Sequence, residues 1–290
     1  MSHDRLSESL DIDRVPTERM VEIIQAEDRS VPDAVAREAR SIARAIDAIA
    51  ERLDEGGRLV YLGAGTSGRI AMLDASELPP TYGVERDLVK VVMAGGEKAF
   101  FSAVEGAEDD EEAAVAEIDR CVTGDDAVVG IAASGTTPFT VAGLRKANMI
   151  GALTVAVTSA AGSTLAREAD IPIVVETGPE VIMGSSRMKS GTAQKLVLNT
   201  ISTGVMIRLG RVFSNLMVEM PATNLKLRGR AVLMVELAAG VDSEAAERAF
   251  LESGSNVKKA IVMAKLGVDA DEAQRRLDAA GGVLRGVLPP

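Results

Sequence analysis

Histidine, cysteine and aromatic residues are nearly missing from this sequence of 290 residues. It has one histidine, His3, and one cysteine, Cys121; it has no tryptophan, and aromatic residues make up only 2%. A single cysteine cannot form an internal disulfide, which fits a reducing compartment, and zinc sites built from histidine and cysteine are excluded. Any acid–base chemistry therefore has to use carboxylates, lysine, tyrosine or hydroxyl groups.

A basic excess and long apolar runs are missing as well. The chain has 43 acidic against 32 basic residues, which gives a net charge of −11. Nucleic-acid-binding domains usually carry a basic stripe or aromatic stacking platforms, so we expect no nucleic-acid partner. No apolar run approaches the length of a membrane span, and residues 1–14 lack the apolar region of a signal peptide. We expect no membrane association and a cytoplasmic location.

What the sequence does have is a repeated pattern of short apolar run, turn and helix. The runs are almost continuously apolar, as in strands that are covered on both faces; they lie at 58–63, 88–94, 127–132, 153–158 and 170–176. The pattern predicts an α/β fold with a five-stranded, parallel, doubly wound sheet flanked by helices. Pro172 in the last run indicates an edge strand.

Helical segments stand on both sides of this pattern. Apolar residues at helical spacing predict one helix over about 31–53 and a longer one over 185–208. Beyond residue 222 the chain reads as helical only, with two similar segments, as in a small ubiquitin-associated-like module. We divide the chain into an N-terminal helical segment at 1–54, the sheet domain at 55–221 and a C-terminal helical module at 222–290.

A glycine-rich loop, GAGTSG at 63–68, lies between the first strand and the following helix. This spacing is the fingerprint of a dinucleotide site, but the acid expected at the end of the second strand is missing. Thr66, Ser67 and Arg69 suit a terminal phosphate or sugar hydroxyls better than a pyrophosphate. A third interpretation is that the glycines serve only the tight turn.

Two further loops combine hydroxyl groups with glycine. ASGTTP at 133–138 follows the third strand, and GSSRMKSGT at 184–192 begins the long helix and adds the cations Arg187 and Lys189. Ligands of open α/β sheets bind at the carboxyl ends of the strands, so the loops together predict a site for a phosphorylated small molecule. Helix capping by the hydroxyls and surface pairing of the cations remain open as alternatives.

Several long stretches resemble the N-acetylmuramic acid 6-phosphate etherase family, which is built on a sugar isomerase (SIS) domain. The stretches are LGAGTSGR at 62–69, LDASE at 73–77, PPT at 79–81, AVEGAED at 103–109, GSSRMKSGTAQK at 184–195, NLMV at 215–218 and ATN at 222–224. The resemblance covers nearly the whole chain. One residue departs from the family pattern, because Thr136 stands where an arginine is expected.

The resemblance implies a phosphosugar-binding SIS domain at 55–221 and a carbon–oxygen lyase reaction. The C3 D-lactyl ether of N-acetylmuramic acid 6-phosphate would be cleaved by elimination and then hydration, giving N-acetylglucosamine 6-phosphate and D-lactate in cell-wall sugar recycling or catabolism. Glu77 would act as the acid and Glu108 as the base, with no cofactor and no metal. The implied substrate-binding residues are Gly65, Thr66, Ser67, Arg69, Ser134, Gly135, Thr137, Ser185, Ser186 and Lys189. A homodimer is implied as well, for which the helix from Arg187 and the apolar segment 212–220 offer a surface.

Without the resemblance, both carboxylates have ordinary alternatives. Glu77 lies between an apolar helix and the Pro79-Pro80 turn, which predicts a partly buried carboxyl near the first loop, but a charge at a helix end is equally expected. Glu108 stands in a run of acids that otherwise indicates a solvated helix start. Two other functions on the same fold also remain open: a phosphosugar aldose–ketose isomerase and a non-catalytic phosphosugar-binding regulator.

Overall fold

The computed structural model describes residues 5–288, so His3 lies outside the described residues. The chain forms two compact units. Unit 1 consists of Met1–Ala75 and Asp87–Thr203, and unit 2 of Ser76–Arg86 and Gly204–Pro290. The three-part division at 54/55 and 221/222 stays a prediction, since these units divide the chain at other positions.

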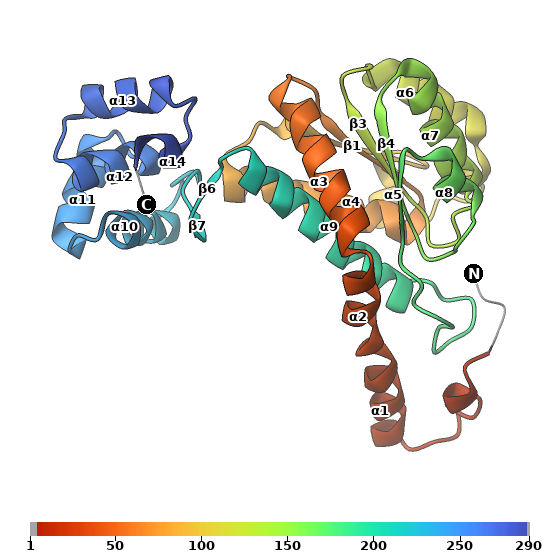
Figure 1. The fold of residues 1–290 in the computed structure, drawn as a ribbon. Helices are drawn as coiled ribbons and strands as arrows, with labels where there is room; N and C mark the ends of the chain where they lie inside the picture. Colours follow the sequence, from red (N-terminus) through yellow and green to blue (C-terminus); the bar gives the residue numbers. More distant parts are fainter. Residues whose placement is uncertain (1–4, 289–290) are drawn as a thin grey trace. The chain divides into compact units, whose positions relative to one another are not determined.

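Unit 1 contains a sheet of five parallel strands in the order β2-β1-β3-β4-β5 (Figure 1). The strands are β1 Leu59–Gly63, β2 Val89–Met93, β3 Ala127–Ile131, β4 Leu153–Thr158 and β5 Ile171–Val174. The predicted strands and their parallel arrangement are confirmed, and Pro172 lies in the edge strand β5. Gly63 at the end of β1 is in register with Ile131 at the end of β3, so the loops that follow these strands leave the sheet as neighbours.

Helices cover both faces of this sheet, as the doubly wound fold requires. The helices from the first to the ninth are α1 Thr17–Asp28, α2 Ser30–Arg37, α3 Ala39–Asp54, α4 Gly65–Tyr82, α5 Lys98–Phe101, α6 Glu111–Cys121, α7 Pro138–Ile150, α8 Thr164–Glu168 and α9 Lys189–Arg208. Of these, α4 and α9 continue into unit 2. Helix α7 packs on β1, β3 and β4, and α3 packs on β4 and β5. Val60 and Leu62 of β1 belong to the same buried cluster as Phe139 and Leu144 of α7, which forms the core of one face.

Three helices differ from their predicted extent. The helix expected over 31–53 is divided in two, because the amide of Glu38 donates to the carbonyl of Val35 and ends α2. The prediction of a turn at Pro79 and Pro80 is wrong. Both prolines lie inside α4, which continues to Tyr82, and the amide of Gly83 donates to the carbonyl of Pro79 at 3.0 Å.

The long helix expected from residue 185 begins later, at Lys189. The side chain of Glu180 is buried and accepts hydrogen bonds from the amides of Lys189 and Ser190, at 2.9 and 3.0 Å. A carboxylate in this place satisfies the first amides of a helix and interacts favourably with the positive end of its dipole. Glu180 therefore fixes the start of α9, and residues 186–188 form a turn before it.

Unit 2 is built mainly from short helices around its own core. Its elements are β6 Val212–Phe213, β7 Leu216–Met217, α10 Leu225–Ala239, α11 Ser243–Glu252, α12 Val257–Leu266, α13 Ala270–Ala279 and α14 Leu284–Val287. Asp242 and Asp269 cap α11 and α13 by accepting hydrogen bonds from the amides of Ala245 and Glu272, at 2.8 Å each. Val218 is buried in the core of this unit, so segment 212–220 is not simply an exposed apolar surface. In residues 5–288, no helix combines the length and the apolar character needed to span a membrane.

Candidate functional site

The glycine-rich loop after β1 brings α4 very close to the sheet. A Cβ atom at Gly68 would lie 3.0 Å from the side chain of Met93 and 3.1 Å from the carbonyl of Gly63, so any larger residue would push α4 or its neighbours apart. Gly65 has a positive φ of 53° and begins α4. The loop therefore makes a tight strand-to-helix turn, and it also directs the first amides of an 18-residue helix outward from the end of β1, an arrangement that favours an anion.

The loop after β3 is built around Gly135. Its φ is 63°, its amide donates to the carbonyl of Ala132 at 3.0 Å, and its carbonyl accepts from the amide of Leu165 at 2.9 Å. The hydroxyl of Ser134 accepts hydrogen bonds from the amide and the hydroxyl of Thr136, at 3.3 and 3.1 Å. Thr136, where the family pattern has arginine, is thus part of the loop's own hydrogen bonding.

These two loops form the walls of a cavity of about 420 Å³ in unit 1. It lies beyond the carboxyl ends of β1 and β3, where the chain order of the sheet reverses and where ligands of open α/β sheets bind. Its lining comprises Ala64, Gly65, Thr66, Ser67, Glu108, Asp109, Ile131, Ala132, Ala133, Ser134, Thr136, Thr137, Pro138 and Ser186. The cavity thus brings together residues from all three loops and one of the two predicted carboxylates.

Glu108 reaches this cavity from a single 3-10 turn, Ala107–Asp109. The following residue, Asp110, accepts a hydrogen bond from the amide of Ala113 at 2.9 Å and caps α6. The cap of the helix is therefore Asp110, and Glu108 lies before it, exposed at the cavity wall. Glu108 also lines a second cavity, of about 360 Å³, together with Gly65 and Arg69.

Glu77 lies further along α4, ten residues beyond Ser67. Its side chain is exposed in the single chain, which contradicts the partly buried setting predicted from the proline turn. The reason is that α4 continues through the prolines, and no turn folds back over the carboxyl. Glu77 is absent from the described residues that line either cavity, and its role as an acid stays a prediction.

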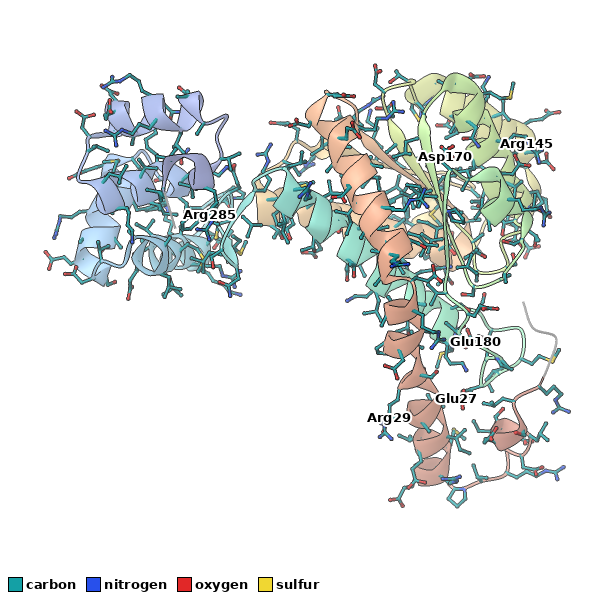
Figure 2. All side chains as sticks on the ribbon, in the orientation of Figure 1. Glu27, Arg29, Arg145, Asp170, Glu180 and Arg285 are labelled. Carbon is teal, nitrogen blue, oxygen red and sulfur yellow. The ribbon has the colours of Figure 1, made fainter. Side chains whose placement is uncertain are left out.

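Two predicted substrate-binding cations are held by other partners. Lys189 is buried, and its Nζ lies 2.6 Å from Oε2 of Glu27 on α1; Figure 2 labels Glu27 and Glu180, whose carboxylates contact the first residue of α9. Arg69 donates to the backbone carbonyls of Ala99 and Phe100, at 2.8 and 3.2 Å. Of the other predicted residues, Gly135 and Ser185 do not belong to the cavity lining among the residues described, whereas Ser186 does.

No lysine or arginine is part of the lining of the 420 Å³ cavity in the described chain. The positive potential available to an anion there comes from backbone amides at the start of α4. Glu108 and Asp109 are its charged side chains. Residues 5–288 contain no group of three or more histidine, cysteine, aspartate or glutamate side chains suited to a metal ion.

A buried polar cluster holds α4 against the sheet and α9. The carboxylate of Asp74 accepts from the hydroxyl of Tyr61 on β1 at 2.8 Å, from Nδ2 of Asn199 at 2.6 Å and from the hydroxyl of Ser202 at 3.0 Å. Burial raises the pKa of Tyr61 well above its ordinary value, and the charge of Asp74 raises it further. Tyr61 is therefore a neutral donor throughout the physiological range.

Gln194 is a functional candidate that the sequence did not single out. It lies on α9 with 2% of its surface exposed, and its Oε1 accepts a hydrogen bond from the hydroxyl of the cavity residue Ser67 at 3.0 Å. Gln194 lies in the stretch 184–195 that resembles the family. A single glutamine in a helix, however, gives no sequence signal of a functional role. The contact joins residues 127 positions apart, and only the folded chain reveals it.

Comparison with known proteins gives matches over most of the chain. A model described as SIS domain matches residues 101–203, and one described as glucokinase regulatory protein N-terminal SIS domain matches residues 41–148. The N-acetylmuramic acid 6-phosphate etherase of Symbiobacterium thermophilum is 58% identical over 268 residues, which cover 92% of this chain and 89% of that protein. The protein of the same name from Clostridium beijerinckii is 51% identical over 288 residues, with coverage of 99% and 95%.

Solved structures with this architecture are more distant in sequence. A phosphoheptose isomerase from Francisella tularensis has a TM-score of 0.51 at 18% identity, covering 66% of this chain and 98% of that one. A phosphoheptose isomerase from Neisseria gonorrhoeae has a TM-score of 0.51 at 16% identity, with coverage of 65% and 98%. At such identities these structures show the fold alone.

Proposed function

Because the chain belongs to the N-acetylmuramic acid 6-phosphate etherase family, we propose that it cleaves the C3 D-lactyl ether of N-acetylmuramic acid 6-phosphate. The products are N-acetylglucosamine 6-phosphate and D-lactate. The observation that carries the proposal is the 420 Å³ cavity, because it unites the hydroxyl-rich loops with Glu108. Amides at the start of α4 and the hydroxyls of Ser67, Ser134 and Thr137 suit a phosphate group, and Ser186 adds a further hydroxyl at the same wall.

The reaction begins with an elimination from the open-chain form of the sugar. The aldehyde at C1 makes the hydrogen on C2 acidic, and the carboxylate of Glu108 removes it as a proton. The electron pair of the C2–H bond forms the C2=C3 double bond while the C3–O bond breaks. Glu77 protonates the departing ether oxygen, and D-lactate leaves with its hydroxyl group restored.

Hydration of the unsaturated aldehyde then completes the product. Glu77, now a carboxylate, removes a proton from water as the water oxygen bonds to C3, and Glu108 returns its proton to C2. Both carboxylates end in their starting protonation states, and the net change is the addition of one water across the ether bond. The two carboxylates and one water balance this route without a metal ion or a redox cofactor.

We further propose that the enzyme acts in the cytoplasm as a homodimer. The single cysteine fits a reducing compartment. Glu77 is exposed in the single chain, which leaves its carboxyl accessible to a neighbouring copy or to substrate.

The decisive experiment measures D-lactate after incubation of the folded protein with N-acetylmuramic acid 6-phosphate, without added cofactor. Lactate release supports the proposed function, and its absence from well-folded protein overturns it. Glu77→Gln and Glu108→Gln should each lower kcat by about 100-fold or more, because each removes a group that transfers a proton. Glu112→Gln, an exposed change in the first turn of α6, is the matched control and should leave kcat close to the wild-type value.

The proton transfer at C2 is tested separately in D2O. If Glu108 returns a solvent-derived proton to C2, the N-acetylglucosamine 6-phosphate formed should carry deuterium there. Product without deuterium at C2 argues against proton abstraction at that carbon. Binding of phosphosugars without lactate release would instead indicate a regulator, and interconversion of aldose and ketose phosphates would indicate an isomerase.

A further inference from the structure

Behind the cavity wall, one hydrogen bond connects α4 to α9. Ser67 in the first turn of α4 lines the cavity, and its hydroxyl donates to Oε1 of Gln194 at 3.0 Å. Both side chains are buried, with 9% and 2% exposed. The other amide atom of Gln194, Nε2, is also buried and has no hydrogen-bond partner in residues 5–288.

The two helices approach each other closely beside this bond, and Gln194 is buried there. A Cβ atom at Gly191, one turn before Gln194 on α9, would lie 3.6 Å from the side chain of Ile70 and 3.8 Å from that of Thr66. The beginnings of α9 and α4 are therefore close neighbours. A half-turn of the amide about its last torsion exchanges the positions of Oε1 and Nε2 without moving either helix.

A serine hydroxyl has one hydrogen, so the direction of this bond determines what Ser67 offers to the cavity. While Ser67 donates to Gln194, only the lone pairs of its oxygen face the cavity, and these repel an anion. Leaving the buried Nε2 group without an acceptor costs free energy in this state. If Nε2 donates to Ser67 instead, the amide donor is satisfied and the serine hydrogen becomes available to a ligand.

We propose that Gln194 is a positioning residue that sets the direction of the Ser67 hydroxyl for the phosphate group of the substrate. When the phosphosugar enters, the amide turns over. Nε2 of Gln194 then donates to Oγ of Ser67, and Ser67 donates its hydrogen to a phosphate oxygen. Two hydrogen bonds in series polarise each other, and the second ends on a charged acceptor, which strengthens it. The inference rests on the proposed function only in the identity of the phosphosugar.

The test compares Gln194→Glu with Gln194→Met in binding of N-acetylglucosamine 6-phosphate, measured by titration calorimetry. Glutamate keeps the shape and the acceptor but has no donor when ionised, so Ser67 stays turned away; the affinity should fall about 10- to 100-fold. Methionine removes both the acceptor and the donor of the amide, so the Ser67 hydroxyl is free to donate to the phosphate. The loss of affinity in Gln194→Met should therefore be several-fold smaller than in Gln194→Glu. If the bond only holds the helices together, the order reverses, because glutamate preserves the bond and methionine does not.

A double-mutant cycle tests whether Gln194 acts through Ser67. In the Ser67→Ala background, Gln194→Glu and Gln194→Met should change the affinity by no more than about twofold, since no hydroxyl remains to be directed. An undiminished effect in that background overturns the inference. Should Gln194→Glu fail to fold, the inference is overturned by a loss of affinity in Gln194→Met that persists undiminished in the Ser67→Ala background. Gln25→Glu on the exposed face of α1 controls for the added negative charge.

Kinetics supply a readout that general destabilisation does not produce. The phosphate is held alike in the ground state and the transition state, so Gln194→Glu should raise KM while kcat changes little. Unchanged KM and unchanged product affinity in a folded Gln194→Glu protein overturn the inference. Absence of lactate release by the wild-type enzyme would overturn the proposed function instead, and the binding cycle would still decide the role of Gln194.

Discussion

At position 135 two independent physical requirements exclude every residue but glycine. The backbone has a φ of 63°, a region that costs L-residues free energy, and a Cβ atom would lie 2.2 Å from the hydroxyl oxygen of Ser163. Gly135→Ala should therefore lower the free energy of unfolding by about 2–5 kcal/mol, the sum of backbone strain and steric overlap. Urea denaturation measures this change.

Gly65 provides the matched control for that substitution. Its φ is similar, 53°, but a Cβ atom there would meet nothing within 4 Å. Gly65→Ala should cost only the backbone term, about 1–2 kcal/mol. Equal losses for the two alanine variants would show that the overlap with Ser163 is relieved by movement and that backbone conformation alone requires the glycine.

At the scale of elements, Arg69 joins α4 to the segment that ends at Glu108. This segment begins at Gly95 and Gly96, both with positive φ, and residues 101–106 are exposed, so the two bonds to α5 are its main attachment to α4. Arg69→Ala should make the amides of residues 98–107 exchange hydrogen at least about tenfold faster, and should lower kcat because Glu108 is less well held.

Arg52→Ala is the matched control for the loss of an arginine. Arg52 also donates to a backbone carbonyl, that of Gly124, at 2.8 Å, but Gly124 precedes β3 and lies at the end of the sheet opposite to the cavity. This variant should leave exchange in residues 98–107 and kcat near the wild-type values. If both variants lower kcat equally, the effect of Arg69 reflects stability and not the placement of Glu108.

Arg58, just before β1, and Asp126, just before β3, form an ion pair at 2.7 Å that makes stability depend on pH. Although burial by itself would raise the pKa of Asp126, hydrogen bonds from Arg58 and from the amide of Thr123 hold it below its usual value. A lowered pKa stabilises the fold above the unfolded-state value of about 3.9, and that contribution disappears as the pH falls through the folded-state pKa.

Asp126→Asn should therefore lose about 2–4 kcal/mol at pH 7 and show a shallower decline between pH 5 and pH 2 than the wild type. Unfolding measured in urea at a series of pH values tests both expectations. Parallel pH profiles for the two proteins would mean that Asp126 is not the group responsible for the acid sensitivity.

The strands and the hydroxyl loops are predictable from the sequence because their signals are local. An apolar run bounded by glycine is enough to locate β1 or β3, and a loop rich in serine, threonine and glycine after such a run marks the ligand-binding edge. The beginning of α9 is not predictable in this way, since the carboxylate that caps it, Glu180, lies outside the helix.

The same distinction holds within the site. Lys189 looks like a substrate cation in the sequence, yet its partner Glu27 is 162 positions away, and no local pattern connects them. Gln194 becomes a candidate site residue only through its hydrogen bond with Ser67, which the sequence does not reveal. The exposure of Glu77 follows from two prolines tolerated inside a helix, which contradicts the usual expectation that proline ends one.

At the scale of the whole molecule, we expect a homodimer. One side of α9 remains exposed, including Lys195, Thr200 and Thr203, and a stable interface needs such a face. Thr203→Arg should weaken self-association at least about tenfold in sedimentation equilibrium, because it places a charge on that face. Ser243→Arg, at the exposed start of α11, should not. A wild-type protein that is monomeric and fully active would contradict the proposed assembly.

The distribution of tyrosine gives this molecule an optical property of its own. The chain has no tryptophan and two tyrosines, Tyr61 in unit 1 and Tyr82 in unit 2, and both are buried. Each unit therefore carries one tyrosine. In Tyr82→Phe the tyrosine absorption band, which lies at longer wavelength than that of phenylalanine, reports on unit 1 alone, and in Tyr61→Phe it reports on unit 2 alone. Comparing the two melting curves reveals whether the units unfold together or in sequence, with no label added.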